Sequence, residues 1–492
     1  MNFEEYYRAK IDKLPDAQDR IFERNNFPEN PNKFHIIGIC GTAMGSLAGL
    51  LSKKGYKVSG SDQVCFPPIS TMLEHLDVDT SFGNFEEGNV GDAEVVVVGN
   101  VAKPHNPEAR FARLNKIPQV TLPEALRNYV FKDAKRIICA GTHGKTTTTG
   151  LLAHIFYTAG KNPGYMIGGV PQQGEDSFAL GSGEYALFEG DEYDTSYFDK
   201  APKFLHYGAQ SAIITSLELD HLDIYDDWTD YKQAFKFLIE SMPKDGLLVI
   251  SDEYLELENL AKKASCKVIL YGSQNRVAKN IRQEGGYQVF DYTIDSKVIG
   301  TLKTPLSGKH NVSNIVAATT LALSEGIEFE DIQKAVLEFS GMKRRQEVKA
   351  EINGITIMDD FAHHPTAVKT TLDGIKKKFH GRRLVALFEP GTNTSRKKIF
   401  EKEYIESFDK ADVIYIKLPP MKEGDNPADF IDGDYVASEI TKHGPKAFST
   451  DNVDDLLDNV VPMLQKDDVV VFMSNRSFDG GLQKLVDRLS EK

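Results

Sequence analysis

Short apolar runs recur along the chain, and polar segments with helical spacing separate them. The runs occupy residues 95–98, 137–140, 185–188, 212–214, 355–358, 384–388, 413–416 and 469–473. Each run has the length of a buried strand, and strands that alternate with helices are typical of parallel sheets. We therefore predict an α/β protein. In such proteins, ligands collect at the carboxyl ends of the strands.

A glycine loop follows the run at 137–140 and leads directly into a helical segment. A strand, a glycine loop and a helix start together aim backbone N–H groups at a phosphate. Gly141 and Gly144 let the backbone approach the anion, Lys145 can reach the terminal phosphates, and the Thr146 hydroxyl can bind Mg²⁺. The loop is shorter than the usual P-loop. The alternative interpretation is an ordinary strand–turn–helix with a surface lysine.

A second strand, glycine loop and helix start occupies residues 34–46, with Gly38, Gly41 and Gly45 in the loop. Asp62 ends the next strand-like segment, where a dinucleotide-binding fold positions its ribose-binding carboxylate. Together these features predict a doubly wound domain that holds a nucleotide diphosphate. Packing glycines are the alternative, because a lone glycine fingerprint is weak.

Polar side chains follow two further runs of the central region. Glu189 stands at the end of the run 185–188, where one carboxylate with phosphates and water suits Mg²⁺. Asp194, further along, is interpreted as part of a solvated turn. His221 follows the run 212–214 and is a candidate to bind a second cation or to orient a carboxylate. A structural histidine is the alternative.

Asn311 and Asn314 open a helical segment near residue 309. They could hydrogen-bond a base edge, but the sequence alone favours a helix cap. A basic cluster at 343–345 then precedes a strand that ends in two acids and two histidines at 359–364. Two later strand tips, 389–396 and 474–481, are polar and contain glycine. We interpret them as a pocket for a polar substrate, with surface loops as the alternative.

Composition narrows the function further. The net charge of −14 over 492 residues argues against a nucleic-acid or membrane-surface binder, and no apolar run reaches membrane-span length. The first residues lack the apolar core of a secretory leader, so we expect a cytoplasmic protein. The four cysteines, Cys40, Cys65, Cys139 and Cys266, show no metal-type pairing, and because three of them lie in or beside apolar runs, we expect buried reduced thiols.

The order of these motifs divides the chain into a polar lead-in and three domains. We expect the lead-in at 1–33, a Rossmann-like domain at 34–133, a central P-loop ATPase-like parallel sheet at 134–340, and a C-terminal Rossmann-like domain at 341–492. We assign no function to the lead-in.

These motifs resemble those of the Mur ligases of peptidoglycan synthesis, and the resemblance runs from about Lys33 onward. The stretch 141–148 is similar to the family's phosphate loop, 189–192 to its Mg²⁺-binding acidic motif, and 220–221 to its second cation position. The stretch 310–314 is similar to its adenine-side motif. The resemblance implies an ATP-dependent ligase that joins an acid to an amine through an acyl phosphate, with ATP and Mg²⁺ as cofactors.

The resemblance also implies roles for individual residues. It implies Lys145, Glu189 and His221 as catalytic residues. It implies Thr146, Glu189 and His221 as metal ligands. It implies ATP binding by Gly141, Thr142, His143, Gly144, Lys145, Thr146, Thr147, Asn311, Arg345 and Asp359. It implies binding of UDP-N-acetylmuramic acid by Gly38, Gly41, Thr42, Met44, Gly45, Ser61, Asp62 and Asn100. It implies peptide binding by His363, His364, Asn393, Thr394, Arg396 and Asn475.

Within the family, the chain is more similar to the member that adds the salvaged tripeptide L-alanyl-γ-D-glutamyl-meso-diaminopimelate than to the member that adds L-alanine. Stretches that carry this choice include 67–71, 191–200, 359–365, 388–394 and 473–475. Gly391 and Arg476 depart from the family pattern, as does Phe235, which stands where some members carry a carbamylated lysine. We expect a monomer. The L-alanine ligase is the first alternative. A nucleotide-dependent switch or dinucleotide oxidoreductase that uses the loop 38–45 is the second, and a non-catalytic binding scaffold, which the number of polar strand tips disfavours, is the third.

Overall fold

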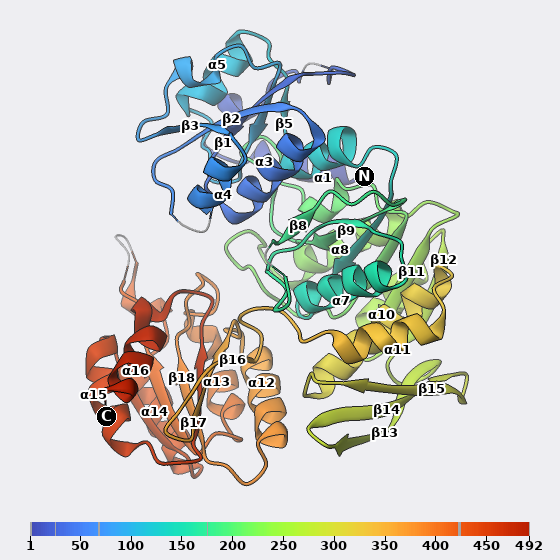
Figure 1. Cartoon of the computed structure of the whole chain (residues 1–492). Coiled ribbons are helices and arrows are strands. Elements are labelled where there is room, and N and C mark those ends of the chain that lie inside the picture. The colour runs from blue at the N-terminus through green and yellow to red at the C-terminus, as the bar shows by residue number, and fades with distance from the viewer. Residues whose placement is uncertain (1, 25, 67–68, 175, 422–424, 492) are drawn as a thin grey trace.

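The computed structural model describes residues 2–24, 26–66, 69–174, 176–421 and 425–491 of the chain. It contains three α/β domains, and the prediction of an α/β chain is confirmed (Figure 1). The N-terminal domain lies at the top of Figure 1, the central domain at the right and the C-terminal domain at the lower left. Pro67 and Pro68, which belong to the stretch 67–71, lie outside the described residues.

The N-terminal domain is a parallel sheet with the strand order β3-β2-β1-β4-β5. Its elements are β1 (Lys33–Ile37), α3 (Thr42–Lys54), β2 (Lys57–Asp62), α4 (Ile69–His75), β3 (Asp79–Phe82), η1 (Glu87–Val90), β4 (Val95–Val98), α5 (Pro107–Leu114), β5 (Gln119–Val120), α6 (Leu122–Ala125) and η2 (Leu126–Val130). Every residue of β4 is fully buried, as expected for a strand covered on both faces.

The central domain is built on a seven-stranded sheet with the order β12-β11-β10-β6-β9-β7-β8, parallel except for β8. Its elements are β6 (Lys135–Ala140), α7 (Lys145–Thr158), β7 (Gly164–Met166), β8 (Phe178–Ala179), β9 (Tyr185–Gly190), η3 (Lys203–Leu205), β10 (Ser211–Ile214), α8 (Trp228–Ser241), β11 (Leu247–Ser251), α9 (Leu255–Ala261) and β12 (Lys267–Tyr271). Because β6 lies between β9 and β10, the tips of these three strands meet at one edge.

A three-stranded antiparallel sheet follows, with the order β13-β14-β15. Its strands and the helices after it are β13 (Arg276–Glu284), β14 (Tyr287–Ile294), β15 (Lys297–Thr304), α10 (Lys309–Ser324) and α11 (Phe329–Glu338). The apolar runs did not predict these strands. The reason is that β13 is mostly exposed and polar, and β14 mixes the buried apolar Val289, Phe290 and Tyr292 with the polar Gln288, Asp291 and Thr293, so neither strand is a continuous apolar run.

The C-terminal domain contains a six-stranded sheet with the order β16-β17-β21-β18-β19-β20, in which only β16 is antiparallel. Its elements are β16 (Glu347–Ile352), β17 (Ile355–Asp360), α12 (Pro365–Lys378), β18 (Leu384–Phe388), η4 (Lys398–Phe400), α13 (Glu401–Ser407), β19 (Val413–Lys417), η5 (Pro427–Asp429), α14 (Gly433–Lys442), β20 (Lys446–Thr450), α15 (Val453–Met463), β21 (Val469–Met473), η6 (Phe478–Gly480) and α16 (Gly481–Ser490).

The N-terminal segment packs against the central domain through α1 (Phe3–Ile11) and α2 (Ala17–Arg20). Tyr6 donates a 2.7 Å hydrogen bond to Asp230, and Lys10 forms an ion pair with the same carboxylate. Arg20 donates to the carbonyl oxygen of Tyr197 at 3.0 Å. These contacts make the segment part of the folded core.

The expectation of reduced thiols is wrong for two of the cysteines. Cys40 and Cys65 form a disulfide, with their Cα atoms 5.2 Å apart. They lie in the loops after β1 and β2, which are neighbouring parallel strands, so the two loops emerge at the same edge of the sheet. Cys139 is a buried free thiol, and Cys266 is a partly buried one. Among the described residues, no helix is both long enough and apolar enough to cross a bilayer.

Candidate functional site

The phosphate loop connects the end of β6 to the first residue of α7. Gly141 and Gly144 both have positive φ angles, of 127° and 84°. A Cβ at Gly141 would lie 2.3 Å from Oγ1 of Thr215, and one at Gly144 would lie 2.5 Å from Oδ1 of Asn314. Glycine is therefore required at both positions, by conformation and by space.

Lys145 is held inside this loop by three acceptors. Its ammonium donates to the carbonyl oxygens of Gly141 and Thr142 at 2.7 and 3.2 Å, and to Oε1 of Glu192 at 3.0 Å. Burial opposes the charge, but the nearby carboxylates of Glu192 and Glu189 outweigh it and raise the pKa of Lys145. The ammonium is therefore charged and is held within the loop by these three acceptors.

Thr146 and Glu189 form the oxygen-rich part of the site. The Thr146 hydroxyl donates to Oε1 of Glu189 at 2.8 Å, and the N–H of Gly168 donates to Oε2 of the same carboxylate at 2.8 Å. Burial raises the pKa of Glu189 despite the charge of Lys145. A hydroxyl beside a partly buried carboxylate is a hard-oxygen donor pair, which fits Mg²⁺.

His221 lies across the same edge. Its Nε2 is 3.3 Å from Oε1 of Glu192 and 3.9 Å from Oδ2 of Asp220. Burial would lower the pKa of His221, but the hydrogen bond to Glu192 and the charge of Asp220 outweigh it and raise that pKa to about 9. As a metal ligand, His221 would have to release this proton.

A second cluster joins the phosphate loop to the C-terminal domain. The ligating atoms of His143, Glu218 and His364 lie within 4.8 Å of one another, a set that could hold a metal ion. Nε2 of His143 is 3.2 Å from Glu218, and Thr366 donates to Glu218 at 2.8 Å. Burial opposes ionisation, yet these hydrogen bonds and the charge of His143 lower the pKa of Glu218 to about 2. The cluster fastens α12 to the central domain.

The other predicted phosphate-loop residues take part in this framework. The Thr142 hydroxyl donates to the carbonyl oxygen of Glu218 at 2.8 Å and lies 2.9 Å from the hydroxyl of Tyr231. Thr147 is buried in the first turn of α7. The hydrogen bonds of Thr142 therefore tie the loop to the segment after β10 and to α8.

The interpretation of Asn311 and Asn314 as helix caps is wrong. Helix α10 begins at Lys309 with Gly308 as its N-cap, so both asparagines lie inside the helix. Asn311 donates to the carbonyl oxygen of Ser307 at 2.7 Å, and Asn314 faces Gly144 of the phosphate loop. The helix starts directly after Gly308, about one turn earlier than it would if Asn311 were its N-cap. The local sequence does not distinguish these two starting points.

Two predicted ATP-binding residues lie on the C-terminal domain. Arg345 lies over the ring of Phe361, 5.1 Å from its centroid. Burial is the main cause that lowers the pKa of His310, and the charge of Arg345 lowers that pKa further. Asp359 accepts a 3.1 Å hydrogen bond from Arg344. The structure thus brings Arg345 towards α10, while Asp359 faces the tip of β21.

The N-terminal glycine loop is braced by the residues around it. Oδ2 of Asp62 accepts the N–H of Cys40 at 2.9 Å, and Ser61 is fully buried and donates to Glu108. Gly38 has a φ of 81°, and Gly41 is the N-cap of α3. The remaining predicted residues of this loop region are Thr42, Met44 and Gly45 on α3, and Asn100 after β4. These positions surround the carboxyl ends of β1, β2 and β4.

The predicted peptide-binding residues divide between two places. Nδ1 of His363 lies 2.9 Å from the carbonyl oxygen of Phe361, and Thr394 accepts the N–H of Leu222, next to His221, at 3.1 Å. Burial lowers the pKa of His363, and also of His364, to about 4. The residues in the tips of β18 and β21 are Asn393, Arg396 and Asn475. Arg396 already forms a 2.7 Å ion pair with Asp425.

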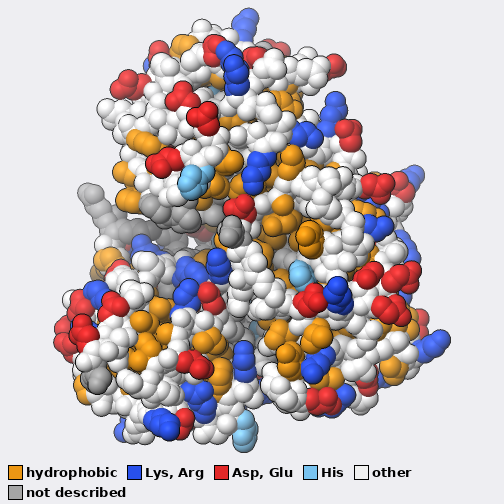
Figure 2. Space-filling model, viewed as in Figure 1, with side chains coloured by type: hydrophobic (Ala, Val, Ile, Leu, Met, Phe, Trp, Pro, Cys, Tyr) orange, Lys and Arg blue, Asp and Glu red, His pale blue; other side chains and the backbone are white. Residues whose placement is uncertain are grey.

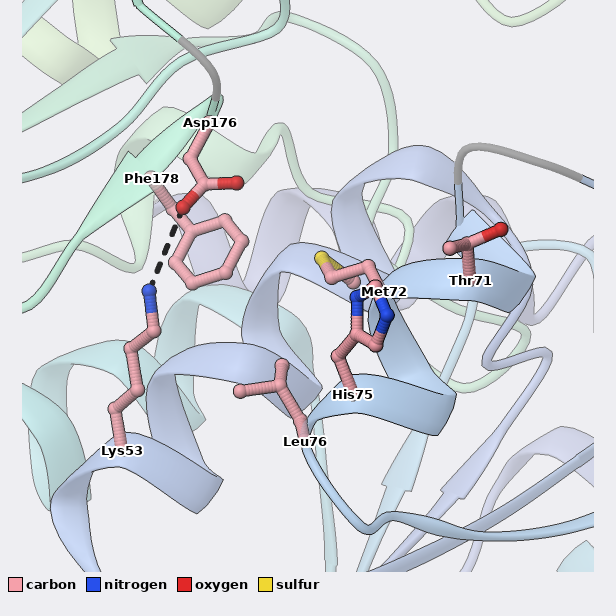
Figure 3. A pocket seen from close by; sticks show the side chains of 7 residues that line it. All are labelled: Lys53, Thr71, Met72, His75, Leu76, Asp176 and Phe178. Carbon is pink, nitrogen blue, oxygen red and sulfur yellow. Dashed lines mark hydrogen bonds and ion pairs between the residues drawn. The ribbon is translucent and has the colours of Figure 1, made fainter.

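Two hollows mark the borders of the N-terminal domain. Figure 2 shows one on this face, between the N-terminal and C-terminal domains, with Lys and Arg side chains gathered on its C-terminal side. The other, of about 490 Å³, lies between α3, α4 and the segment before β8 (Figure 3). There Lys53 pairs with Asp176 at 3.5 Å, and its Nζ lies 4.7 Å from the centre of the Phe178 ring. None of the predicted site residues lines this second hollow.

Sequence reasoning missed Glu192 and Glu218. Glu192 is fully buried and contacts both Lys145 and His221. Glu192 belongs to the run of acidic residues from 189 to 194, but the position at the end of the strand favoured Glu189 as the metal ligand. The sequence around Glu218 gave no comparable sign, because its partners are distant in the chain: His143 in the phosphate loop and Thr366 in α12.

Three features together indicate a nucleotide-using enzyme. They are the charged lysine in a glycine loop, the carboxylate and histidine beside it, and the attachment of the C-terminal domain to that loop. Comparisons with known proteins give the class. Three Mur ligase domain families match in order: the Mur ligase family, catalytic domain, at 33–130; the Mur ligase middle domain, at 139–322; and the Mur ligase, glutamate ligase domain, at 344–476.

The chain is 34% identical over 463 residues to the UDP-N-acetylmuramate–L-alanyl-γ-D-glutamyl-meso-2,6-diaminoheptandioate ligase of Haemophilus influenzae, covering 93% of this chain and 99% of that relative. It is 33% identical, over 84% of its length and 89% of the relative, to the UDP-N-acetylmuramate–L-alanine ligase of Desulforapulum autotrophicum. A crystal structure of a murein peptide ligase from Psychrobacter arcticus superposes with a TM-score of 0.68 at 32% identity, covering 94% of this chain and 99% of that one.

The chain belongs to the Mur ligase family. It is an ATP-dependent ligase that forms an amide bond, as the sequence predicted.

Proposed function

We propose that this enzyme joins UDP-N-acetylmuramic acid to the tripeptide L-alanyl-γ-D-glutamyl-meso-diaminopimelate in the cytoplasm, with ATP as the energy source, in peptidoglycan recycling. The observation that carries the choice of tripeptide is the similarity to the Haemophilus influenzae ligase, which spans 93% of this chain and 99% of that relative. The L-alanine ligase is the second candidate, because its Desulforapulum autotrophicum representative is nearly as similar, at 33%.

The chemistry requires two anions to meet. In the reaction that we propose, the muramyl carboxylate attacks the γ-phosphate of ATP, ADP leaves, and the amine of the peptide then displaces phosphate from the acyl phosphate. The charged Lys145 of the phosphate loop supports this step, because a fixed cation stabilises charge that develops on the transferred phosphoryl group. The fastening of α12 to the loop through Glu218 supports a closed arrangement that excludes water from the acyl phosphate.

We propose that Thr146 and Glu189 hold one Mg²⁺ and that His221 holds a second. The ions would supply charge neutralisation at the phosphates. The adjoining oxygens of Thr146 and Glu189 support this assignment. ATP binding by the loop 141–147 and by Asn311, Arg345 and Asp359 remains a proposal, as do the boundaries at 34, 134 and 341. The UDP-sugar and peptide sites and the monomeric state are also proposals.

The test supplies the purified enzyme with UDP-N-acetylmuramic acid, ATP, Mg²⁺ and either the tripeptide or L-alanine. We expect phosphate release and a product of the summed mass, less one water, with the tripeptide. Omission of UDP-N-acetylmuramic acid is the control for uncoupled ATP hydrolysis. A product with L-alanine alone would establish the second candidate instead.

A further inference from the structure

The loops that follow β18 and β21 contact each other at Gly391. The two strands are parallel neighbours, with Phe388 opposite Met473. A Cβ at Gly391 would lie 2.2 Å from Oδ1 of Asn475, and 2.6 and 2.7 Å from Cγ and Cδ of Arg476. The stem of Arg476 therefore lies across Gly391, and it occupies the space that a side chain at 391 would need.

The backbone beneath Arg476 is fixed. Arg344 donates to the carbonyl oxygens of Ser474 and Arg476 at 2.8 and 2.6 Å, and the N–H of Arg476 donates to Oγ of Ser474 at 2.9 Å. The Ser474 hydroxyl in turn donates to the buried Glu389 at 2.7 Å. An arginine whose backbone and stem are fixed in this way loses less freedom when it binds a ligand than one on a loose loop.

The carboxylates around this tip already have cationic partners. Asp359 pairs with Arg344 at 3.1 Å. Glu389 and Asp479 both pair with the buried Lys417, at 2.8 and 2.7 Å. Arg476 is exposed, and within the described ranges no carboxylate lies within 4.0 Å of its guanidinium.

The same tip also offers an unused acceptor and an open space. Oδ1 of Asn475 is buried and, among the described residues, has no hydrogen-bond partner. A cavity of about 230 Å³ is lined by Arg344, Asp359, Arg476 and Phe478, among others. A free guanidinium beside an unpaired amide oxygen suits a ligand that carries both a carboxylate and an N–H group, such as a peptide.

Chain connectivity limits the distance between Arg476 and the residues next to His221. Thr394 contacts Leu222, the neighbour of His221, and it is three residues from Gly391. Three extended residues span at most about 11 Å. Gly391, and with it the stem of Arg476, therefore lies within about 11 Å of Thr394, a span that a tripeptide with its amine near His221 can bridge.

We propose that Arg476 is a specificity-determining residue that binds a carboxylate on the last residue of the acceptor peptide, while Asn475 accepts one of its N–H groups. This inference rests on the proposed function, since it assumes an acceptor of peptide length. Bidentate pairing of guanidinium with carboxylate then selects an acidic peptide over a neutral one.

The test measures KM and kcat for the tripeptide, and for an analogue whose last residue has carboxamides in place of carboxylates. For the variant Arg476→Gln we expect the KM of the tripeptide to rise about 10- to 100-fold, as for the loss of a hydrogen bond to a charged group, with kcat and the KM values of ATP and UDP-N-acetylmuramic acid little changed. Arg476→Lys should restore part of the loss. The analogue should bind wild type and Arg476→Gln equally poorly.

The control is Arg488→Gln, which removes an exposed arginine from α16 that pairs with Asp454 and Asp458. It should leave every KM unchanged. An unchanged KM of the tripeptide in Arg476→Gln would overturn the inference, while product formation by the wild type would still support the proposed function. If the wild type ligates only L-alanine, the proposed function fails and the inference fails with it.

Discussion

The ammonium of Lys145 lies 3.0 Å from Oε1 of Glu192, a carboxylate with no exposed surface. The same oxygen is 3.3 Å from Nε2 of His221. One buried carboxylate therefore holds the cation of the phosphate loop and the histidine of the next strand tip in a single arrangement. This network aligns the parts of the site that come from β6, β9 and β10.

Replacing Glu192 by Gln should lower kcat by roughly 10- to 100-fold, because two partly buried cationic groups, Lys145 and His221, lose their shared countercharge. Steady-state turnover with saturating substrates measures the effect. Glu184→Gln, at an exposed position just before β9, is the matched control and should keep normal turnover. Wild-type kcat in Glu192→Gln would show that the carboxylate does not organise the site.

Lys145→Ala should reduce kcat by at least about 100-fold, because one well-placed electrostatic contact contributes roughly 3–4 kcal/mol in a transition state. Lys161→Ala removes an exposed lysine beyond the far end of the same helix and serves as the control. Phosphate release with both substrates present is the readout. Near-normal release by Lys145→Ala would remove the lysine from the mechanism.

The disulfide predicts the thiol count of the purified, unreduced protein. After denaturation, two of the four cysteines, Cys139 and Cys266, should react with a thiol reagent, and all four should react after reduction. Reduction should lower the free energy of unfolding by roughly 2–4 kcal/mol, because the bridge restricts the unfolded chain. The double variant Cys40→Ser, Cys65→Ser should be insensitive to reductant. Four reactive thiols before reduction would contradict the structure.

Glu218 should make the contact between the central and C-terminal domains sensitive to acid. Its pKa is about 2 in the folded protein, below the ordinary value of 4.5, so its stabilisation is complete above pH 4.5 and is lost as the pH falls towards 2. Glu218→Gln removes this term, which we place at roughly 1–3 kcal/mol. The difference in thermal midpoint between wild type and Glu218→Gln should therefore shrink from pH 5.5 to pH 3.5. A constant difference would argue against an ionised Glu218 in this contact.

The sequence by itself determined the features whose parts are contiguous. The eight apolar runs predict β4, β6, β9, β10, β17, β18, β19 and β21, because a strand buried on both faces is apolar throughout, whereas partly exposed strands such as β3 and β20 contain no such run. The phosphate loop is equally local, since its glycines, lysine and threonine are consecutive and their spacing alone creates the geometry. The family resemblance rests on such local motifs, and the comparisons confirm it.

Only the tertiary structure decided which distant residues complete the site. Glu192 meets Lys145 because β9 lies beside β6, and Thr366 reaches Glu218 only because the C-terminal domain packs there. Cys40 meets Cys65, and Arg476 covers Gly391, for a similar reason. Strand order in a sheet depends on the packing of the whole domain, so contacts between neighbouring strand tips leave no signal in the local pattern of residues.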